Sequence, residues 1–456
     1  MALGTSEATV RQASGRPTFV LADSAIRGDG GHHREYAVHV LQAALNAGLR
    51  PAVFAAASVE GSFPPGVTVV PTFADDAWVR LAQRLMRAWP GVVTSEPAGT
   101  PRDAPARPRP LVRAMRGAML SLRASVHRWR RARELRHALA TIGPGLPDLV
   151  FVPSVSGTEL GALDRVFTGS RANCLRIVIR RLEDLTFAGG RGSARTAVRR
   201  LADGGARFYC DTGQLCAHVE AACGVRPALI PIPIPPFPEA EGIASSPVVA
   251  YLGDARIEKG FLHLPGIVRA LIEHRDVPSD VRFVIQAAST ARDAAELQAL
   301  AQARQSLRAI DHQRVTVVHE PLPTEAYHRL IQGAAVVILP YDAVAYADRS
   351  SGVFADALAW GVPPIIQNGT WMADQLLRVG PKGIDGAPHP MVTDLVVSSP
   401  VDFSRAVMVA LGRASILRDL FGATKANWRT AHSAEAVLRA ISAGDGGIHG
   451  QSRIKS

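Results

Sequence analysis

Short runs rich in β-branched residues alternate with longer stretches of helical periodicity through most of this chain of 456 residues. In the second half, strands are predicted at 248–252, 281–287, 315–318, 335–339 and 364–367. In the first half, strand candidates lie at 18–21, 51–55, 67–70, 149–152, 175–179 and 207–210. Such alternation is typical of parallel sheets with crossover helices. It predicts an α/β protein with two Rossmann-like, doubly wound domains that face a cleft.

The Pro-rich segment IPIPIPPFP at 230–238 interrupts this alternation. Proline lacks the amide donor that a helix or a sheet needs, and it favours a stiff, extended connector. We therefore place the boundary here, between an N-terminal domain at 17–236 and a C-terminal domain at 237–440. The small, polar and aperiodic ends, 1–16 and 441–456, are predicted to be disordered tails.

The sequence contains no continuous apolar run of about 18 residues, and its start lacks the apolar core of a signal peptide. We therefore expect a cytoplasmic protein. Its four cysteines form no CxxC pair and have no histidine at zinc-ligand spacing. Reduced thiols are expected, and no metal site is predicted.

The loop YLGDARIEKGF at 251–261 places two cations between a predicted strand and a predicted helix. Arg256 and Lys259 lie beside Gly253 and Gly260, so the backbone can approach a ligand closely. Two cations on such a loop suit a diphosphate, whose oxygens take charge-assisted hydrogen bonds. The alternative is a pair of ordinary surface cations.

The segment AYADRSSGVFADALAWG at 345–361 is the sharpest signal in the chain. The start of a predicted helix offers an anion free amides, hydroxyls and the positive end of the helix dipole. These groups belong to Arg349, Ser350, Ser351 and Gly352. Asp348 and Asp356 flank the start, either to contact both ends of an extended ligand or as an N-cap and an unrelated surface carboxylate. After the next strand, Thr370 follows Gly369 in a loop that can also approach a ligand.

The order of these motifs resembles the donor half of retaining GT-B glycosyltransferases, especially those of family four. The resemblance rests on the KG loop at 259–260, LPY at 339–341, RSSGVFADALAWG at 349–361 and GTWM at 369–372, and it covers about residues 248–439. It implies a GT-B fold and transfer of a sugar from a nucleotide-diphosphate sugar, with retention. The expected acceptor is a glycan or a lipid-linked acceptor in polysaccharide or glycoconjugate biosynthesis.

The resemblance also implies roles for single residues. Lys259 matches the lysine that holds the donor diphosphate, and Arg256 substitutes for an arginine whose usual place is taken by Asp254. Asp348 and Asp356 match two glutamates, of which the first binds the donor sugar and the second the ribose. Catalysis is then mainly stabilisation of the departing phosphate by the two cations and by amides at 351–352. No convincing DxD loop is present, so metal independence is predicted, with no cofactor beside the nucleotide-sugar co-substrate.

The first half is expected to bind the acceptor. Its glycine-rich loop at 28–40 includes Gly30 and Gly31, which match the turn that approaches the donor phosphates in such enzymes. His32 and His33 follow, either to bond a sugar hydroxyl or phosphate or as incidental residues. At the end of a later strand, Arg180 and Arg181 either bind an acceptor phosphate or pair with Glu183 and Asp184.

Residues 102–136 contain eleven arginines against Asp103 and Glu134. Apolar residues recur at helical spacing from 111 to 139, which predicts a basic amphipathic segment within 100–140. Such a helix can lie on an anionic membrane, here the inner face of the plasma membrane. The alternative is a helix whose apolar stripe packs on the first domain. Aromatic residues are sparse and no recognition motif accompanies the charge, so no nucleic-acid partner is predicted.

Two other functions remain open from the sequence. One is a catalytically silent GT-B scaffold or regulatory protein, which the two shortened carboxylates favour. The other is a nucleotide-sugar epimerase or a phosphorylase on the same architecture, for which no acid and base carboxylates or cofactor lysine can be placed.

Overall fold

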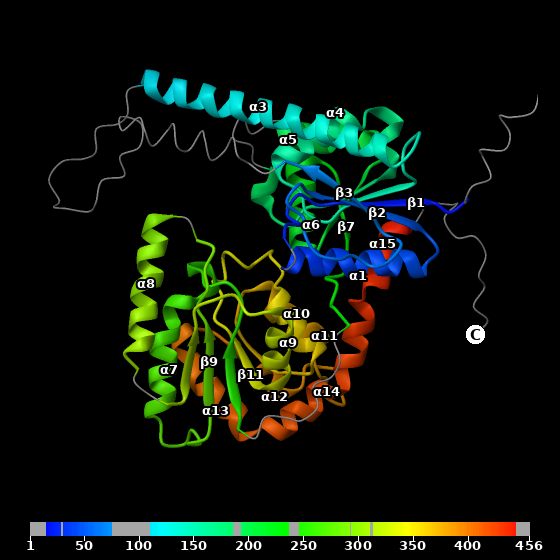
Figure 1. Ribbon diagram of the computed structural model, residues 1–456. Helices are drawn as coiled ribbons and strands as arrows, with labels where there is room; N and C mark the ends of the chain where they lie inside the picture. Colours follow the sequence, from blue (N-terminus) through cyan, green and yellow to red (C-terminus); the bar gives the residue numbers. More distant parts are fainter. Residues whose placement is uncertain are drawn as a thin grey trace, which may run out of the picture. The chain divides into compact units, whose positions relative to one another are not determined.

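The computed structural model describes residues 15–28, 31–74, 110–185, 193–236, 246–291, 293–310 and 313–443, with side chains except at 32, 110–123 and 193. Contacts divide the chain into two compact units, residues 1–208 with 219–227 and residues 209–218 with 228–456. Two parallel sheets alternate their strands with helices, so the predicted α/β architecture with two Rossmann-like domains is confirmed (Figure 1). The domain bounds stay a prediction, and both predicted tails lie outside the described residues except for 15–16 and 441–443.

The first sheet has seven strands in the order β3-β2-β1-β4-β5-β6-β7. They are β1 (Thr18–Ala22), β2 (Arg50–Ala56), β3 (Thr68–Phe73), β4 (Leu149–Val152), β5 (Leu175–Val178), β6 (Arg207–Cys210) and β7 (Ala228–Leu229). The helices are α1 (His32–Asn46), α3 (Pro110–Thr141), α4 (Gly157–Val166), α5 (Ser193–Asp203) and α6 (Gly213–Cys223), with 3-10 turns η1 (Gly169–Cys174) and η2 (Leu182–Leu185). β4 and β5 are buried throughout, as expected of parallel strands with both faces covered.

The second sheet has six strands in the order β10-β9-β8-β11-β12-β13. They are β8 (Val248–Tyr251), β9 (Arg282–Gln286), β10 (Val315–Val318), β11 (Ala334–Leu339), β12 (Pro364–Gln367) and β13 (Val396–Val397). The helices are α7 (Leu264–Glu273), α8 (Ala294–Arg308), α9 (Thr324–Gly333), α10 (Gly352–Ala359), α11 (Trp371–Val379), α12 (Pro390–Thr393), α13 (Phe403–Gly412), α14 (Ala414–Ala431) and α15 (Ala434–Ser442). Short 3-10 turns are η3 (Ile257–Lys259), η4 (Phe261–His263) and η5 (Pro400–Asp402).

Both sheets reverse their strand order beside their first strand, between β1 and β4 and between β8 and β11. The strand pairings on either side of each reversal are parallel. In each sheet, the loops that follow the two strands beside the reversal therefore leave the same edge and run in opposite directions along it. Ligands of open parallel sheets bind outside this edge, so the fold itself selects two places to search.

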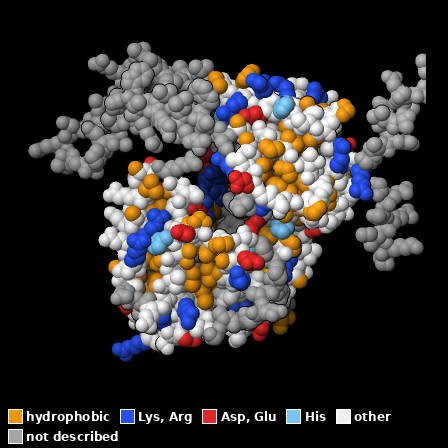
Figure 2. Space-filling view, viewed as in Figure 1, with side chains coloured by type: hydrophobic (Ala, Val, Ile, Leu, Met, Phe, Trp, Pro, Cys, Tyr) orange, Lys and Arg blue, Asp and Glu red, His pale blue; other side chains and the backbone are white. Residues whose placement is uncertain are grey.

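Helix α3 packs against α4 and β3. Its buried residues between 124 and 141 are Ala124, Arg131, Ala132, Leu135, Ala138 and Leu139. Hydrophobic, basic and histidine side chains lie together along the edge of the surface over α3 (Figure 2). Among the described helices, none combines the length with the apolar character that crossing a bilayer requires.

Candidate functional site

The loops that follow β8 and β11 touch each other at the strand-order reversal of the second sheet. The amide of Asp342, after β11, donates a hydrogen bond of 2.9 Å to the carbonyl of Glu258, after β8. Gly260 has φ 71°, and a Cβ there would overlap the carbonyl oxygen of Pro340. Only glycine therefore allows the two loops to approach this closely.

Lys259 ends η3 on the first of these loops, and its ammonium lies at the centre of the candidate site. A Cβ on Gly253 would lie 3.2 Å from the Lys259 Nζ and 3.2 Å from Val353 Cγ2 in the first turn of α10. The ammonium, the end of β8 and the start of α10 therefore converge at one place. The Nζ also lies 5.7 Å from the centre of the Tyr341 ring, within cation–π range.

The charge of Lys259 is held in an environment that disfavours it. The two carboxylates of its loop pair instead with Arg256. Asp254 lies 3.1 Å from the Arg256 Nε, and Glu258 lies 3.1 Å from its Nη1. Within the described ranges no carboxylate lies at ion-pair distance from Lys259. Burial, with Arg256 nearby, lowers the pKa of Lys259 to about 8. A bound anion would offset this cost and favour the charged form.

Arg256 differs from Lys259 because its charge already has partners. Its side chain is 35% exposed and pairs with Asp254 and Glu258. Asp254 is itself fixed, since its carboxylate accepts hydrogen bonds from the amide and the hydroxyl of Thr290, at 2.8 and 2.5 Å. A diphosphate that bound Arg256 would have to replace these carboxylates.

Helix α10 begins beside Lys259 with amides that the helix does not use. Ser351 caps it: its hydroxyl accepts from the Phe354 amide at 3.3 Å, and its carbonyl accepts from the Ala355 amide at 3.0 Å. The amides of Gly352 and Val353 precede the first helical hydrogen bond and have no backbone acceptor in the described structure. Because Gly352 is exposed, these amides and the positive helix end suit an anion.

The residues just before α10 are tied to residues 209–218, which belong to the same compact unit. Nδ1 of His218 lies 2.7 Å from Oδ2 of Asp348, and the Ser350 hydroxyl donates a 2.5 Å hydrogen bond to the carboxylate of Asp211. Asp348 is 19% exposed. Arg349, between them, is partly exposed and has interactions of its own.

Asp356 lies one turn inside α10 and has a different partner. Its Oδ2 accepts a hydrogen bond of 2.8 Å from the hydroxyl of Tyr327 on α9. The two aspartates that the sequence sets eight residues apart are thus held by His218 and by Tyr327 respectively. No sequence pattern points to either of these partners, because both come from elsewhere in the chain.

Thr370 caps α11. Its hydroxyl accepts from the Ala373 amide at 3.3 Å and donates to the Gln367 carbonyl at 2.9 Å, and the residue has no exposed surface. Its structural place is the N-cap, since both hydrogen-bonding functions of the hydroxyl are in use.

Two further residues shape this site without belonging to any motif. Gln286, at the end of β9, is buried, and its Oε1 accepts the Gly253 amide at 2.7 Å, which fixes the turn under Lys259. Tyr346 packs its ring 4.5 Å from that of Tyr341, and burial raises its pKa to about 12, so the phenol stays neutral. A glutamine that ends the apolar run VRFVIQ is the one signal that could have found Gln286.

The reversal in the first sheet carries a histidine and an aspartate. Asp23 follows β1, is 4% exposed, and accepts the Ala25 amide at 2.8 Å through Oδ1. Its Oδ2 lies 2.8 Å from Nδ1 of His33, which is 32% exposed on the first turn of α1. Gly31 caps this helix with φ 96°, and Gly30 lies outside the described residues. The contact with Asp23 fixes the orientation of the imidazole.

Tyr36 and Arg180 extend this edge. The Tyr36 ring stacks on Phe151 of β4 at 6.2 Å, and the Arg180 guanidinium lies 5.5 Å from the centre of the Tyr36 ring. Arg180 Nε also donates to the Pro153 carbonyl at 3.0 Å. Arg181 pairs with Asp184 at 3.2 Å, so pairing within the loop, the alternative for these arginines, holds for Arg181.

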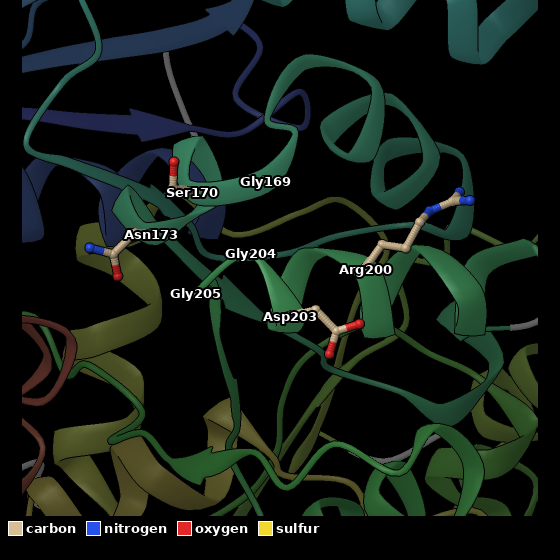
Figure 3. A pocket seen from close by; sticks show the side chains of 7 residues that line it. All are labelled: Gly169, Ser170, Asn173, Arg200, Asp203, Gly204 and Gly205. Carbon is tan, nitrogen blue, oxygen red and sulfur yellow. The ribbon is translucent and has the colours of Figure 1, made fainter.

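An open hollow elsewhere in the first sheet is not this site. It lies where η1 and the turn after α5 precede β5 and β6, at the amino edge of the strands. Figure 3 shows its lining: Gly169, Ser170, Asn173, Arg200, Asp203, Gly204 and Gly205. Arg200, the cation there, pairs with Asp164. Its position opposite the ligand edge argues against a substrate site.

The described residues contain no group of three or more histidine, cysteine, aspartate or glutamate side chains arranged to hold a metal ion. No known protein family matches the sequence, and no curated protein matches it.

The fold defined by these two sheets is the GT-B architecture. The chain is similar to the trehalose-6-phosphate synthase OtsA, with 12% identity and a TM-score of 0.60 over 93% of this chain and 98% of that chain. It is also similar to a sucrose-phosphate synthase from Thermosynechococcus elongatus, with 14% identity and a TM-score of 0.58 over 94% and 98%. A third similar structure is a UDP-forming trehalose-phosphate synthase from Burkholderia xenovorans in complex with glucose-6-phosphate. It has 13% identity and a TM-score of 0.58 over 93% of this chain and 100% of that chain. At these identities the likeness shows the fold, which was predicted as GT-B.

Proposed function

We propose that this chain is a retaining glycosyltransferase that transfers a sugar from a nucleotide-diphosphate sugar to a glycan or lipid-linked acceptor. The site at the reversal of the second sheet supplies what a leaving diphosphate needs. The Lys259 ammonium, the helix-start amides of Gly352 and Val353 and the loop glycine Gly253 lie together there. The similar solved structures are named as sugar-phosphate synthases. Membership of family four is part of the same proposal.

The observation that carries the proposal is the position of the Lys259 ammonium between Gly253 and the first turn of α10. Burial and the nearby Arg256 disfavour the charge there and lower the pKa of Lys259 to about 8, and within the described ranges no carboxylate lies at ion-pair distance from it. A lysine that is largely removed from water for structural reasons alone would normally gain a carboxylate partner. An ammonium kept in this state is suited to an anionic ligand that brings its own compensation.

In the proposed reaction, the bond between the anomeric carbon and the diphosphate oxygen breaks, and its electron pair leaves with the nucleotide. An acceptor hydroxyl oxygen bonds to the anomeric carbon, and its proton passes to the departing phosphate. Lys259 and the amides of Gly352 and Val353 stabilise the charge that develops. Asp348 binds a hydroxyl of the donor sugar, and Asp356, held by Tyr327, binds the ribose. Arg256 gives secondary electrostatic support.

We further propose that turnover is independent of a divalent metal, since an ammonium and helix amides perform the charge stabilisation. Activity should persist in excess chelator. A strict requirement for manganese or magnesium would overturn this part alone.

For the acceptor, we propose the edge that carries Asp23, His33 and Arg180. The oriented imidazole suits a hydroxyl, and a guanidinium stacked on Tyr36 suits a phosphate, which both lipid-linked and phosphorylated sugars contain. Polysaccharide or glycoconjugate assembly is the process that such an acceptor indicates.

The test is binding of UDP-, GDP-, ADP- and dTDP-sugars by thermal shift, followed by calorimetry with the nucleotide diphosphate that stabilises most. Ligand at about a hundred times its Kd stabilises by about 2.7 kcal/mol. Lys259→Met should weaken diphosphate binding by about ten- to a hundredfold, because a charge-assisted hydrogen bond contributes about 1.5–3 kcal/mol. Lys382→Met, which removes an exposed lysine bonded to the Leu377 carbonyl, is the matched control. Equal affinity of both variants would contradict the proposal.

A catalytically silent donor-binding protein is the second candidate. It is favoured by the contact between His218 and Asp348, which occupies one oxygen of the carboxylate proposed to bind the sugar. Donor hydrolysis separates the two functions. A retaining transferase hydrolyses its own donor slowly, whereas a silent protein binds the donor and leaves it intact.

A further inference from the structure

The apolar stripe of α3 does not stay on one face of the helix. Val126, Trp129, Ala132 and Leu135 follow one another at intervals of three residues. Each residue turns an α-helix by about 100°, so nine residues place Leu135 about half a turn away from Val126. Ala132 and Leu135 are accordingly buried, whereas Val126 and Trp129 are 58% and 54% exposed. The stripe predicted as one surface is two.

The exposed side of α3 between 124 and 141 includes Val126, Trp129, Arg133, Arg136 and His137, and these five residues are here called the Trp129 face. The Arg133 guanidinium lies 5.8 Å from the centre of the Trp129 ring. Arg136 donates a hydrogen bond to the Arg165 carbonyl at 3.1 Å. Large apolar and cationic side chains therefore share the face.

The Trp129 face carries no compensating negative charge from its own helix. Glu134 is the one acidic residue between 124 and 141. Its Oε2 lies 3.0 Å from Arg131 Nη1 and its Oε1 lies 3.5 Å from Arg130 Nε, so it is occupied at the inner side of the helix. Val126 and Trp129 leave large apolar side chains open beside the arginines. A second copy of this face would bring arginine against arginine.

We propose that the Trp129 face docks on an anionic lipid surface. Tryptophan favours the level of the lipid headgroups, where its apolar ring and its N–H group are both accommodated. Arginines beside it meet the lipid phosphates, and each contributes on the order of 1 kcal/mol near an anionic bilayer. The face gives the protein shallow, reversible attachment that is independent of the donor site.

The test is sedimentation of the full chain with vesicles of phosphatidylcholine alone or mixed with phosphatidylglycerol. We expect binding to the mixed vesicles, weakening as salt is added. Arg133→Gln with Arg136→Gln should lower this binding by up to about thirtyfold at low salt. Val126→Ser with Trp129→Ser should lower it at every salt concentration. All four side chains are exposed, so circular dichroism and the unfolding temperature should be unchanged.

The matched control is Arg226→Gln with Arg329→Gln, which removes the same charge from two arginines that are 83% and 69% exposed elsewhere in the chain. It should bind vesicles like the unaltered chain, as should Lys259→Met. The tryptophan emission should shift to the blue with mixed vesicles, and Trp129→Phe should remove that shift.

Three results would overturn the proposal. One is equal binding to neutral and anionic vesicles, and another is vesicle binding by both face variants that matches the control. The third is binding of structured RNA that the face variants lose while vesicles are not bound, which would assign the face to nucleic acid instead.

Discussion

The two sheets share the order of their first six strands, yet the edges where that order reverses carry different chemistry. In the second sheet, Lys259 holds a charge without a carboxylate partner in the described part of the chain. In the first sheet, Asp23 is buried and bound to His33 at 2.8 Å. The fold determines where a ligand can bind, and the side chains determine what kind of ligand it is. We propose that one edge binds an anion and that the other binds a hydroxyl.

The largest expected effect comes from a substitution that forces apart the two loops at the edge of the second sheet. Gly260→Ala places a Cβ against the Pro340 carbonyl at a φ of 71° that side chains disfavour. We expect a loss of about 2–4 kcal/mol in the free energy of unfolding and loss of nucleotide-diphosphate binding. Urea unfolding and calorimetry measure the two quantities.

Gly266→Ala is the control for this change. Gly266 lies in α7, and a Cβ there meets nothing within 4 Å, so the substitution should be neutral or stabilising by up to about 1 kcal/mol. If Gly260→Ala behaved like Gly266→Ala, the second edge would not depend on the close contact of its loops.

Much of this comparison could be predicted from the sequence, because periodicity and helix-start chemistry are local. Most strands, the start of α10 and the place of Lys259 after β8 follow from residues that are close together in the chain, whereas β7 and β13 are not predicted. The partners of the two aspartates do not, since His218 lies 130 residues from Asp348 and Tyr327 lies 29 from Asp356. The cap role of Thr370 and the change of face along α3 depend on burial, which a spacing pattern does not give.

The second effect is the pH dependence of donor binding. The pKa of Lys259 is about 8 in the free protein, and a bound diphosphate raises it. Above pH 8, binding must therefore take up a proton, and the Kd of the nucleotide diphosphate should rise by up to about tenfold for each further pH unit. Calorimetry in buffers of different ionisation enthalpy measures this uptake. Lys259→Met should remove the dependence, and a dependence that persisted in this variant would have to come from another group.

The third effect belongs to the first edge. Asp23→Asn removes the negative charge that orients His33, at a cost of about 1–2 kcal/mol in the free energy of unfolding. Once an acceptor is known, its KM should rise while donor hydrolysis stays unchanged. Asp148→Asn makes the same change at the amino end of the sheet, where Asp148 accepts the Thr18 amide, and should leave this KM unaltered. Weaker donor binding in Asp23→Asn would contradict the assignment of donor and acceptor to different sheet edges.

The smallest effect at neutral pH is expected from Arg256→Gln. Its ion pairs are partly exposed and contribute little to stability, so unfolding should change by less than about 1 kcal/mol. If Arg256 acts on the donor only through Lys259, diphosphate affinity at pH 7 should hardly change. Its removal also leaves Asp254 and Glu258 without their cation beside Lys259, and both effects raise the pKa of that lysine. The pH at which affinity begins to fall should then move upward. A loss of tenfold or more at pH 7 would instead show that Arg256 binds the diphosphate directly, after exchanging its carboxylates for phosphate.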